Sequence, residues 1–425
     1  MNSTQPPPQS PLIRVPGEIS LLIYSHLSNR DIKNLRLVSS FFERTACLRL
    51  ARVFISANPL NIEVFEAISQ HDRYRAQVTE IIWDEALLDP GPESGQQCPR
   101  WYRLAYEDCC WRSHAEEGID YRPDAPQLSL EESWAHYQSL LQQQQEVLDS
   151  RAHVLALESA IGRFPALRKI TITGIGYGLN QRYETPMDRA FPYGAKDMGQ
   201  GGFRVVMHLL AQNLDAGKVT ELDIRAFYYP KLSIDFFEKP CQALTDFQTV
   251  LWRGNFESLH LDLTSGDTGD SRSRYPFERV LAGAADGQGL KKLTLHSNDI
   301  KFPLRTIFNP SSLLRLEHFN LTHFWVDQQD LLAVLAMLPR IRTIELNWLF
   351  VGNASHYSLL HQIKDTLGWQ DRIIKPRLSF VLDYNMGRSI WVEKEVHEFL
   401  YEGGVNPFRT WHSAAPRSVG IEIDT

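Results

Sequence analysis

Residues 290–295 read LKKLTL, and residues 316–321 read LEHFNL. Both segments have apolar residues at the first, fourth and sixth positions. The same spacing recurs in VTEIIW from Val78, LRKITI from Leu167, VTELDI from Val219, FESLHL from Phe256 and IRTIEL from Ile341. Apolar residues that alternate with polar ones are typical of a strand with one buried face. The repeated segment therefore predicts a set of related strands in one sheet.

Helix-like segments, with apolar residues three and four positions apart, separate these strands. They cover residues 203–214, 241–253, 275–285, 328–338 and 357–369. A repeated strand and helix resembles the leucine-rich-repeat solenoid, in which parallel strands stack into a curved sheet. The distance between strands varies from about 25 to about 50 residues and the regular Asn is missing, so the repeats are irregular. A doubly wound α/β domain is the alternative, although its strands would be apolar on both faces.

Three further segments complete the pattern. Residues 130–161 predict one long helix, whose four consecutive glutamines, Gln142 to Gln145, are expected on a solvated side. Residues 86–133 contain turn signals without a period and predict an inserted mobile region. Residues 377–385 and 391–404 break the repeat and predict a capping strand and helix.

Composition limits the classes of partner. The 425-residue chain is 43% hydrophobic and 22% charged, as globular proteins are, and its formal net charge is −7. Its Lys and Arg residues form no stripe that could neutralise a nucleic-acid backbone. The longest apolar run, about eight residues, is too short for a membrane span, and residues 1–11 lack the features of a signal peptide. Five irregularly spaced cysteines fit free thiols. We therefore expect a cytoplasmic or nuclear protein that binds neither nucleic acid nor membrane.

The N-terminal region predicts a very small helical bundle after a flexible tail. Helices are expected to start at Pro16, Ser28 and Ser39, because each residue favours a helix N-terminus. Apolar residues follow with helical spacing: Ile19, Leu22, Ile23 and Leu27, then Ile32, Leu35, Leu37 and Val38, then Phe42, Ala46, Leu50 and Val53. So small a bundle buries little surface, and either the rest of the chain or a partner protein is expected to cover its apolar side.

Residues 14–56, RVPGEISLLIYSHLSNRDIKNLRLVSSFFERTACLRLARVFIS, resemble the F-box. The residues that match the motif are Pro16, Glu18, Ile19, Ile23, Leu27, Asp31, Leu35, Val38, Ser39 and Phe42. The sequence departs from the motif at Val15 and Ile32, where most members carry Leu, and at Phe42, where many carry Trp. Residues 58–86 continue in the manner of filamentous-fungal F-box proteins, with a short helix and a strand that ends in Trp-Asp.

This resemblance implies a non-catalytic substrate receptor of a Skp-cullin-F-box ubiquitin ligase. Such proteins dock on a Skp-type adaptor, and through it on a cullin, and present a protein substrate with their C-terminal domain. The residues implied to form or support the adaptor surface are Pro16, Ile19, Ile23, Leu27, Leu35, Val38, Ser39 and Phe42. A scaffold that binds the adaptor without a cullin is the alternative.

The expected fold class is α+β overall. A disordered tail at residues 1–11 precedes a three-helix F-box at 12–56. An irregular α/β leucine-rich-repeat-like solenoid with parallel strands follows at 57–425, interrupted by the mobile insert.

The repeated strands also predict where a substrate binds. In each strand, the residues between and after the last two apolar positions should turn away from the helices, onto an open concave face. Alignment of the repeats puts two polar rows there: Asp223, His260, Thr294, Asn320 and Glu345, then Arg225, Asp262, His296, Thr322 and Asn347. The residues expected to contact a polar protein substrate are Asp223, Arg225, His260, Asp262, His296, Asn320 and Glu345. The loops at the strand ends are the alternative site.

The sequence contains no motif for a metal site, a phosphate-binding loop or an active site. The only Cys/His cluster, Cys98, Cys109, Cys110 and His114, lacks the close ligand pairs of a zinc site. The glycines that could cradle a phosphate have neither the Walker nor the Rossmann spacing: Gly194, Gly199, Gly201 and Gly202. Asp267 and Asp270 do not fit the calcium loop. Hydrolase, metalloprotease and kinase motifs do not occur. We therefore expect no metal, no cofactor and no catalytic residue.

Overall fold

A computed structural model of the protein describes residues 14–88, 100, 102–103, 129–173, 201–213, 218–225, 232–237, 240–253, 256–264, 289–301, 304, 313–352, 354–384 and 388–410. In these ranges twelve strands form one sheet, in which ten follow one another in the order of the chain. These ten are β1 (Arg52–Ser56), β2 (Glu80–Asp84), β3 (Lys169–Thr173), β4 (Glu221–Arg225), β6 (Ser258–Thr264), β7 (Lys292–Lys301), β8 (His318–Asp327), β9 (Thr343–Asn347), β11 (Arg377–Tyr384) and β12 (Arg388–Val392). Two short strands pair beside this path, β5 (Leu232–Ser233) with β6 and β10 (Phe350–Gly352) with β8.

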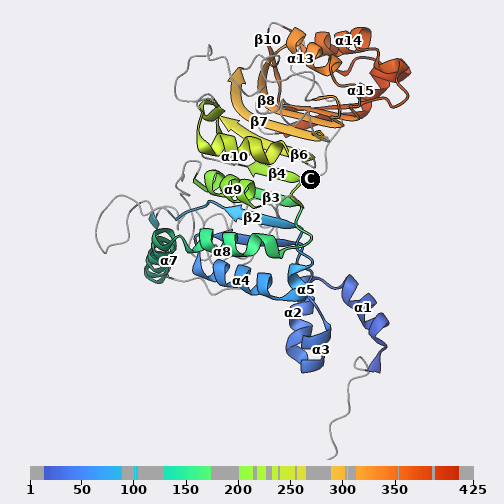
Figure 1. Ribbon diagram of the computed structural model, residues 1–425. Helices are drawn as coiled ribbons and strands as arrows, with labels where there is room; N and C mark the ends of the chain where they lie inside the picture. Colours follow the sequence, from blue (N-terminus) through green and yellow to red (C-terminus); the bar gives the residue numbers. More distant parts are fainter. Residues whose placement is uncertain are drawn as a thin grey trace, which may run out of the picture.

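The strand predictions are confirmed for all seven repeated segments. Neighbouring strands are parallel throughout, apart from the β11–β12 pair. Each of these seven strands starts at the third residue of its segment. The first apolar residue of the segment, such as Val219 or Leu290, is buried just before the strand begins. The protein is thus a mixed α/β fold with a mostly parallel sheet (Figure 1).

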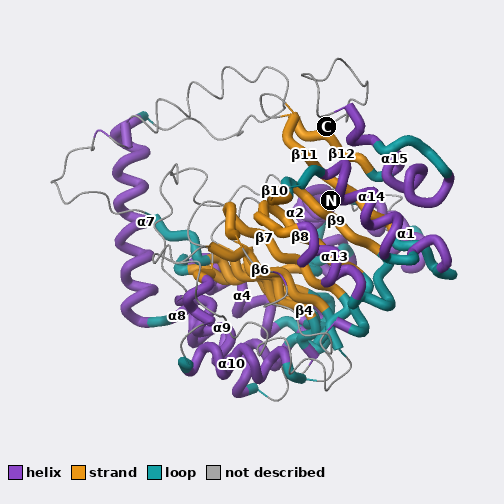
Figure 2. The backbone as a smooth tube through the Cα atoms, turned by 90° about the horizontal axis from the view of Figure 1, so that it is seen from above, coloured by secondary structure: helices purple, strands orange, loops and turns teal. Residues whose placement is uncertain are grey.

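Helices pack on one face of this sheet and alternate with the strands along the chain. The neighbours α4 (Pro59–Gln70), α8 (Ala152–Ala160), α9 (Gly201–Gln212) and α10 (Gln242–Leu251) cover the first half, and α13 (Gln328–Ala336) and α14 (His356–Thr366) cover the second (Figures 1 and 2). A continuous apolar core fills the layer between helices and strands. The predicted helices are confirmed here, and the one expected at 275–285 lies outside the described residues.

The long helix predicted at residues 130–161 is two helices. α7 (Leu130–Ser150) ends at Arg151, whose φ of 54° is left-handed, and α8 follows directly. The expectation of a solvated glutamine run is wrong for Gln144, which is buried and bonds with its amide to the backbone N–H and C=O of Leu88. This residue therefore holds the chain beyond β2 against α7, which stands apart from the other helices in Figure 2. Most of the predicted mobile region 86–133 lies outside the described residues.

Three short helices precede the sheet and lie beyond its first strand in Figure 1: α1 (Gly17–His26), α2 (Asn29–Val38) and α3 (Ser40–Thr45). Ser28 and Asp31 form a reciprocal capping box at the start of α2, and Ser39 caps α3. The prediction that the third helix extends through Leu50 and Val53 is wrong. Val53 lies in β1, where its buried side chain joins the core of the sheet instead.

The C-terminal end differs from the predicted break in the repeat. β11 continues the parallel ladder, with Arg377 opposite Thr343, and only β12 reverses direction. The short helical turns α15 (Lys394–His397) and η9 (Glu398–Glu402) then pack at this end. Within the described part of the chain, no helix has the length and apolarity that crossing a membrane requires.

Candidate functional site

The first candidate surface is apolar and belongs to α1 and α2. Six large apolar side chains on these two helices are between 38% and 86% exposed: Ile19, Leu21, Leu22, Ile23, Leu37 and Val38. A single exposed apolar side chain is ordinary, whereas a group on two adjacent helices is typical of an interaction surface.

The bundle beneath this surface has a very small core. Four residues are buried in it: Tyr24, Ile32, Phe42 and Ala46. Around them pack Leu27, Leu35, Phe41 and Leu48. Tyr24 and Ser20, not the aliphatic residues of α1, are the buried side chains of this helix. Ile19, Leu22 and Ile23, which helical spacing assigned to one side of this helix, are therefore exposed, whereas Leu27 at its end packs against the core.

The eight residues implied to form or support an adaptor surface divide into two groups. The exposed ones are Pro16, Ile19, Ile23 and Val38. The others support the bundle: Phe42 is buried, Leu27 and Leu35 pack against the core, and the Ser39 hydroxyl accepts the Phe42 N–H. Leu21, Leu22 and Leu37 are exposed residues that the motif comparison did not single out.

Arg49 fastens the bundle to the chain that enters the sheet. Its guanidinium donates to the backbone carbonyls of Ser25 and Leu27, at the end of α1. Its backbone N–H donates to Asn29, whose amide returns a bond to the Arg49 carbonyl at 2.8 Å. These contacts link the end of α1 and the start of α2 to the segment that precedes β1.

The second candidate surface is the sheet face opposite the helices, the open face. The predicted rows are confirmed by the pairing: Asp223 lies opposite His260, followed by Thr294, Asn320 and Glu345. In the next row Asp262 lies opposite His296, followed by Thr322 and Asn347. The alternation of the hexapeptide therefore predicted both the face and the register.

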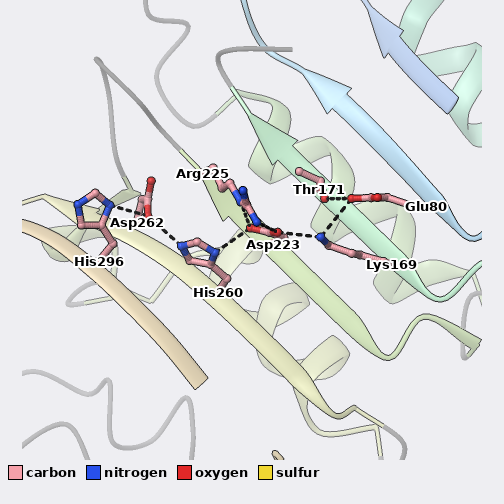
Figure 3. Close-up of polar contacts among 8 residues, drawn as sticks. All are labelled: Glu80, Lys169, Thr171, Asp223, Arg225, His260, Asp262 and His296. Carbon is pink, nitrogen blue, oxygen red and sulfur yellow. Dashed lines mark hydrogen bonds and ion pairs between the residues drawn. The ribbon is translucent and has the colours of Figure 1, made fainter. Parts of the chain in front are cut away.

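Charged side chains on this face form a connected series, the charge ladder, shown in part in Figure 3. Glu80 contacts Arg52 at 2.9 Å and Lys169 at 3.2 Å, and Lys169 also reaches Asp223 at 2.8 Å. The series runs from β1 to β7, and its members are Arg52, Glu80, Lys169, Asp223, Arg225, His260, Asp262 and His296.

The centre of the ladder is the carboxylate of Asp223. Arg225 donates two hydrogen bonds to it, from Nε and from a terminal nitrogen, both at 2.8 Å. His260 Nδ1 lies 3.0 Å from the same carboxylate, and its Nε2 lies 3.2 Å from Asp262. His296 Nδ1 contacts Asp262 at 3.1 Å. A single imidazole thus bridges two carboxylates on adjacent strands.

The acids of the charge ladder are more buried than its bases. The side chains of Glu80, Asp223 and Asp262 are at most 9% exposed, whereas those of the five bases are 23% to 53% exposed. Asp223 and Asp262 belong to the predicted polar rows but are therefore buried. The outer layer of the ladder consists of cationic and imidazole groups, with the carboxylates underneath.

The proximity of opposite charges sets the protonation of the ladder. Burial would raise the pKa of Asp223, but the hydrogen bonds and charges of His260 and Arg225 outweigh it and hold this pKa well below its usual range. His260 and His296 have the same effect on the pKa of Asp262. Burial would lower the pKa of His260, yet its bonds to Asp223 and Asp262 raise it. The acids are therefore anionic, and a protonated His260 is favoured.

Two of the seven predicted substrate residues lie outside the ladder. Asn320 donates from Nδ2 to Glu345 at 2.6 Å, and Thr322 donates to Asn320 at 2.8 Å, so they form a separate polar group on β8 and β9. Conversely, the prediction missed Arg52, Glu80 and Lys169. Arg52 begins β1, a strand that was not predicted. Glu80 and Lys169 occupy the third position of their hexapeptides, which faces the same side as the two rows, so the alternation could have identified them.

An aromatic run extends the ladder towards β9. The rings of His296 and His323 lie 5.4 Å apart, and His323 stacks on Trp348 at 4.9 Å with 11° between the rings. His323 and Trp348 have φ values of 59° and 45°, which non-glycine residues rarely adopt. Such conformations cost about 1–3 kcal/mol each and concentrate at functional sites. No glycine marks either position, so the sequence carried no signal for this pair.

The remaining sequence candidates provide no site. The described residues include no group of His, Cys, Asp and Glu side chains arranged to hold a metal ion. Cys98, Cys109, Cys110, His114, Gly194, Gly199, Asp267 and Asp270 lie outside the described residues. Gly201 and Gly202 begin α9, where Gly202 packs so closely on Trp83 that an added Cβ would lie 2.2 Å from its ring nitrogen.

Comparison with known proteins assigns the chain to no family. No family model matches the sequence, and a search of curated proteins finds no significant relative.

Proposed function

We propose that the chain is a substrate receptor of a Skp-cullin-F-box ubiquitin ligase, in which α1 to α3 bind a Skp-type adaptor. The observation that carries this proposal is the group of exposed apolar side chains on α1 and α2, in a segment whose sequence resembles the F-box. Ubiquitin transfer itself belongs to other subunits, so the chain needs no catalytic residue. This function places it in the cytoplasm or the nucleus.

The energetics of the bundle support a protein partner. Full burial of one large aliphatic side chain contributes about 1.5–3 kcal/mol, so a partner that covers several of these six gains a substantial part of its binding free energy from them. The bundle's own core consists of four buried side chains, and none of the six belongs to it. The partner surface should therefore be apolar at its centre.

The sheet would supply the substrate-binding part of the receptor. Ten strands in chain order, parallel up to β11 and covered by helices on one face, are consistent with a degenerate leucine-rich-repeat-like solenoid. The open face carries the charge ladder and the aromatic run, and we place protein-substrate binding there. Within the seven residues predicted for this role, Asp223, Arg225, His260, Asp262 and His296 act together through the ladder.

Co-purification with a Skp-type adaptor tests the proposal. Val38→Asp and Leu37→Asp place a charge on the exposed surface without touching the core of the bundle and should abolish binding. Leu155→Asp is the matched control, because Leu155 is 58% exposed on α8, in the helix layer of the sheet. Leu27→Asp is less suitable, because Leu27 packs against the core. Retained adaptor binding by both surface variants would refute the proposal.

A scaffold that binds the adaptor without assembling a ligase is the alternative. The two functions share the surface of α1 and α2 and differ only in the next subunit. If cullin co-purifies with the wild-type chain and is lost together with the adaptor in Val38→Asp, the chain is the ligase receptor. Adaptor binding without cullin identifies the scaffold.

A further inference from the structure

We infer that the open face binds an extended acidic peptide segment that carries an aromatic side chain about six residues from its acids. This inference rests on the proposed function, since it names the class of substrate that the receptor presents. It is carried by the layering of the charge ladder and by its continuation into the aromatic run.

The charge ladder offers an excess of positive charge to a ligand. It contains three carboxylates, three permanent cations and two imidazoles, so protonation of His260 alone leaves it positive. The carboxylates are covered, while the bases lie outermost. An approaching peptide therefore meets guanidinium, ammonium and imidazole groups first, which favours carboxylates over cationic side chains.

The bases also keep hydrogen-bond capacity for a ligand. Arg225 has five N–H donors, of which Asp223 engages two, and Arg52 contacts Glu80 through Nε. Lys169 has three donors and two carboxylate partners. The buried acids hold these side chains in place, so a peptide carboxylate would bind to groups that are already ordered.

Acidic side chains elsewhere on this face limit the cationic part. Asp84 is buried and accepts the Ala86 N–H, and Glu221 lies at the start of β4, in line with Lys169. Glu345 is bonded to Asn320 on β9. The peptide acids should therefore bind at Lys169, Arg225 and the two imidazoles, because the neighbouring Thr171 and Thr173 on β3 are buried. The segment beyond the acids should not be acidic.

The aromatic run determines which kind of side chain the peptide carries beyond its acids. His323 and Trp348 are stacked and half-buried, and their left-handed backbones are held by neighbouring strands. The Ser297 hydroxyl donates to the His323 carbonyl, and the Trp348 N–H donates to Val381, both at 2.7 Å. A fixed pair of flat rings at the end of a cationic track suits an aromatic side chain of the ligand.

The spacing of the strands gives the spacing in the ligand. β4 and β9 are four strands apart along the sheet, which corresponds to roughly 19 Å. An extended chain covers about 3.3 Å per residue, so about six residues separate an acid at Arg225 from an aromatic residue at Trp348.

The test uses dye-labelled peptides of about nine residues, with three Glu at one end, one Trp at the other and Gly and Ser between, made in both directions. Fluorescence anisotropy is measured with the full chain in the absence of adaptor. The control peptides replace the three Glu with Gln, or the Trp with Ala. In one of the two directions, the Glu–Trp peptide should bind about tenfold more tightly than either control. Its affinity should fall with added salt. The Lys–Trp counterpart should not bind.

Two variants assign the ends of the peptide. Arg225→Gln should remove the preference for Glu over Gln and leave the preference for Trp over Ala, and Trp348→Ala should do the reverse. Arg204→Gln, an exposed arginine of α9, is the matched control and should change neither preference. Circular dichroism checks folding, and if Arg225→Gln does not fold, the wild-type peptide series alone decides.

Equal binding of the Glu and Gln peptides, or binding of the Lys peptide, overturns the inference. So does a single-stranded oligonucleotide that binds more tightly than the acidic peptide, since the face would then serve nucleic acid. Adaptor binding without acidic-peptide binding refutes only this inference. Acidic-peptide binding without adaptor binding refutes the ubiquitin-ligase proposal and leaves the ligand class of the face in place.

Discussion

The helical bundle and the sheet distribute apolar and charged side chains in opposite ways. α1 and α2 expose six large apolar side chains above a core of four buried ones. The sheet buries a continuous apolar core on one face, and on the other it also buries three carboxylates beneath their basic partners. The bundle therefore has apolar surface outside its own core, whereas the sheet has buried carboxylates that are each paired with basic side chains. We expect a partner at both surfaces: at the exposed apolar side chains of the bundle and at the basic side chains above the buried carboxylates of the sheet.

The largest expected effect is in the core of the sheet. Phe319→Ala removes a fully buried ring from β8 and should lower the free energy of unfolding by about 3–5 kcal/mol, measured by denaturant unfolding followed by circular dichroism. Leu314→Ala, at a residue that is 54% exposed, should change it by less than about 0.5 kcal/mol. Similar effects of the two substitutions would show that β8 does not belong to a common core.

The next effect concerns the buried charge. Asp223→Asn leaves Arg225, Lys169 and His260 without their shared anion and should lower the free energy of unfolding by about 3 kcal/mol. The double variant Asp223→Asn/Arg225→Gln should be less destabilised than the sum of the single variants, because the two residues interact directly. The exposed carboxylate of Asp149 provides the control substitution Asp149→Asn. Strict additivity would mean that the ladder contributes no coupling.

A smaller effect should appear with pH. Because the folded pKa of His260 is raised, its contribution to stability is complete below the unfolded pKa of about 6.5 and is lost as the pH rises through the folded value. The lowered pKa values of Asp223 and Asp262 act in the opposite direction, and their contribution is lost only in strong acid. The lowered pKa values of the buried His153 and His356 favour higher pH, so the contribution of His260 is read from the difference between variants. Relative to wild type, His260→Gln should lose more stability near about pH 6 than near about pH 9. Equal losses at the two pH values would assign the pH dependence to another group.

The smallest expected effect is on the surface of the bundle. Leu37 is 86% exposed, so Leu37→Ser should change the free energy of unfolding of the free chain by less than about 0.5 kcal/mol. Ile32→Ser, one turn away on the same helix, removes a buried side chain and should unfold the bundle while the sheet stays folded. Thermal melts followed by circular dichroism distinguish the two. A strongly destabilised Leu37→Ser would mean that another part of the chain already covers this surface.

Much of the sheet could be predicted, because its information is local and repeated. The hexapeptide defines which side chains are buried, and period-two geometry then places Asp223 beside His260 and Asp262 beside His296. β1 was missed, since Val53 fits a helical continuation of Phe42, Ala46 and Leu50 as well as a strand. The neighbouring strand β2 decides between the two, and local periodicity contains no information about it.

The chemistry of the open face was less predictable than its register. The buried carboxylate of Asp223 contacts Lys169, Arg225 and His260, which come from three strands, and that of Asp262 contacts His260 and His296. Local alternation does not predict these contacts. The left-handed backbones of Arg151, His323 and Trp348 lack the glycine that usually announces them. Gln144 is buried because Leu88, 56 residues away in the sequence, supplies both of its hydrogen-bond partners.

The reversal of β12 has a consequence for self-association. A stack of parallel strands has two open edges, and identical chains could in principle join edge to edge into an endless filament. β12 ends the stack with a short antiparallel strand followed by α15 and η9, so a second copy finds no parallel continuation of β11 there. A chain that stopped at Tyr384 would present β11 itself as the terminal edge and would be prone to polymerise.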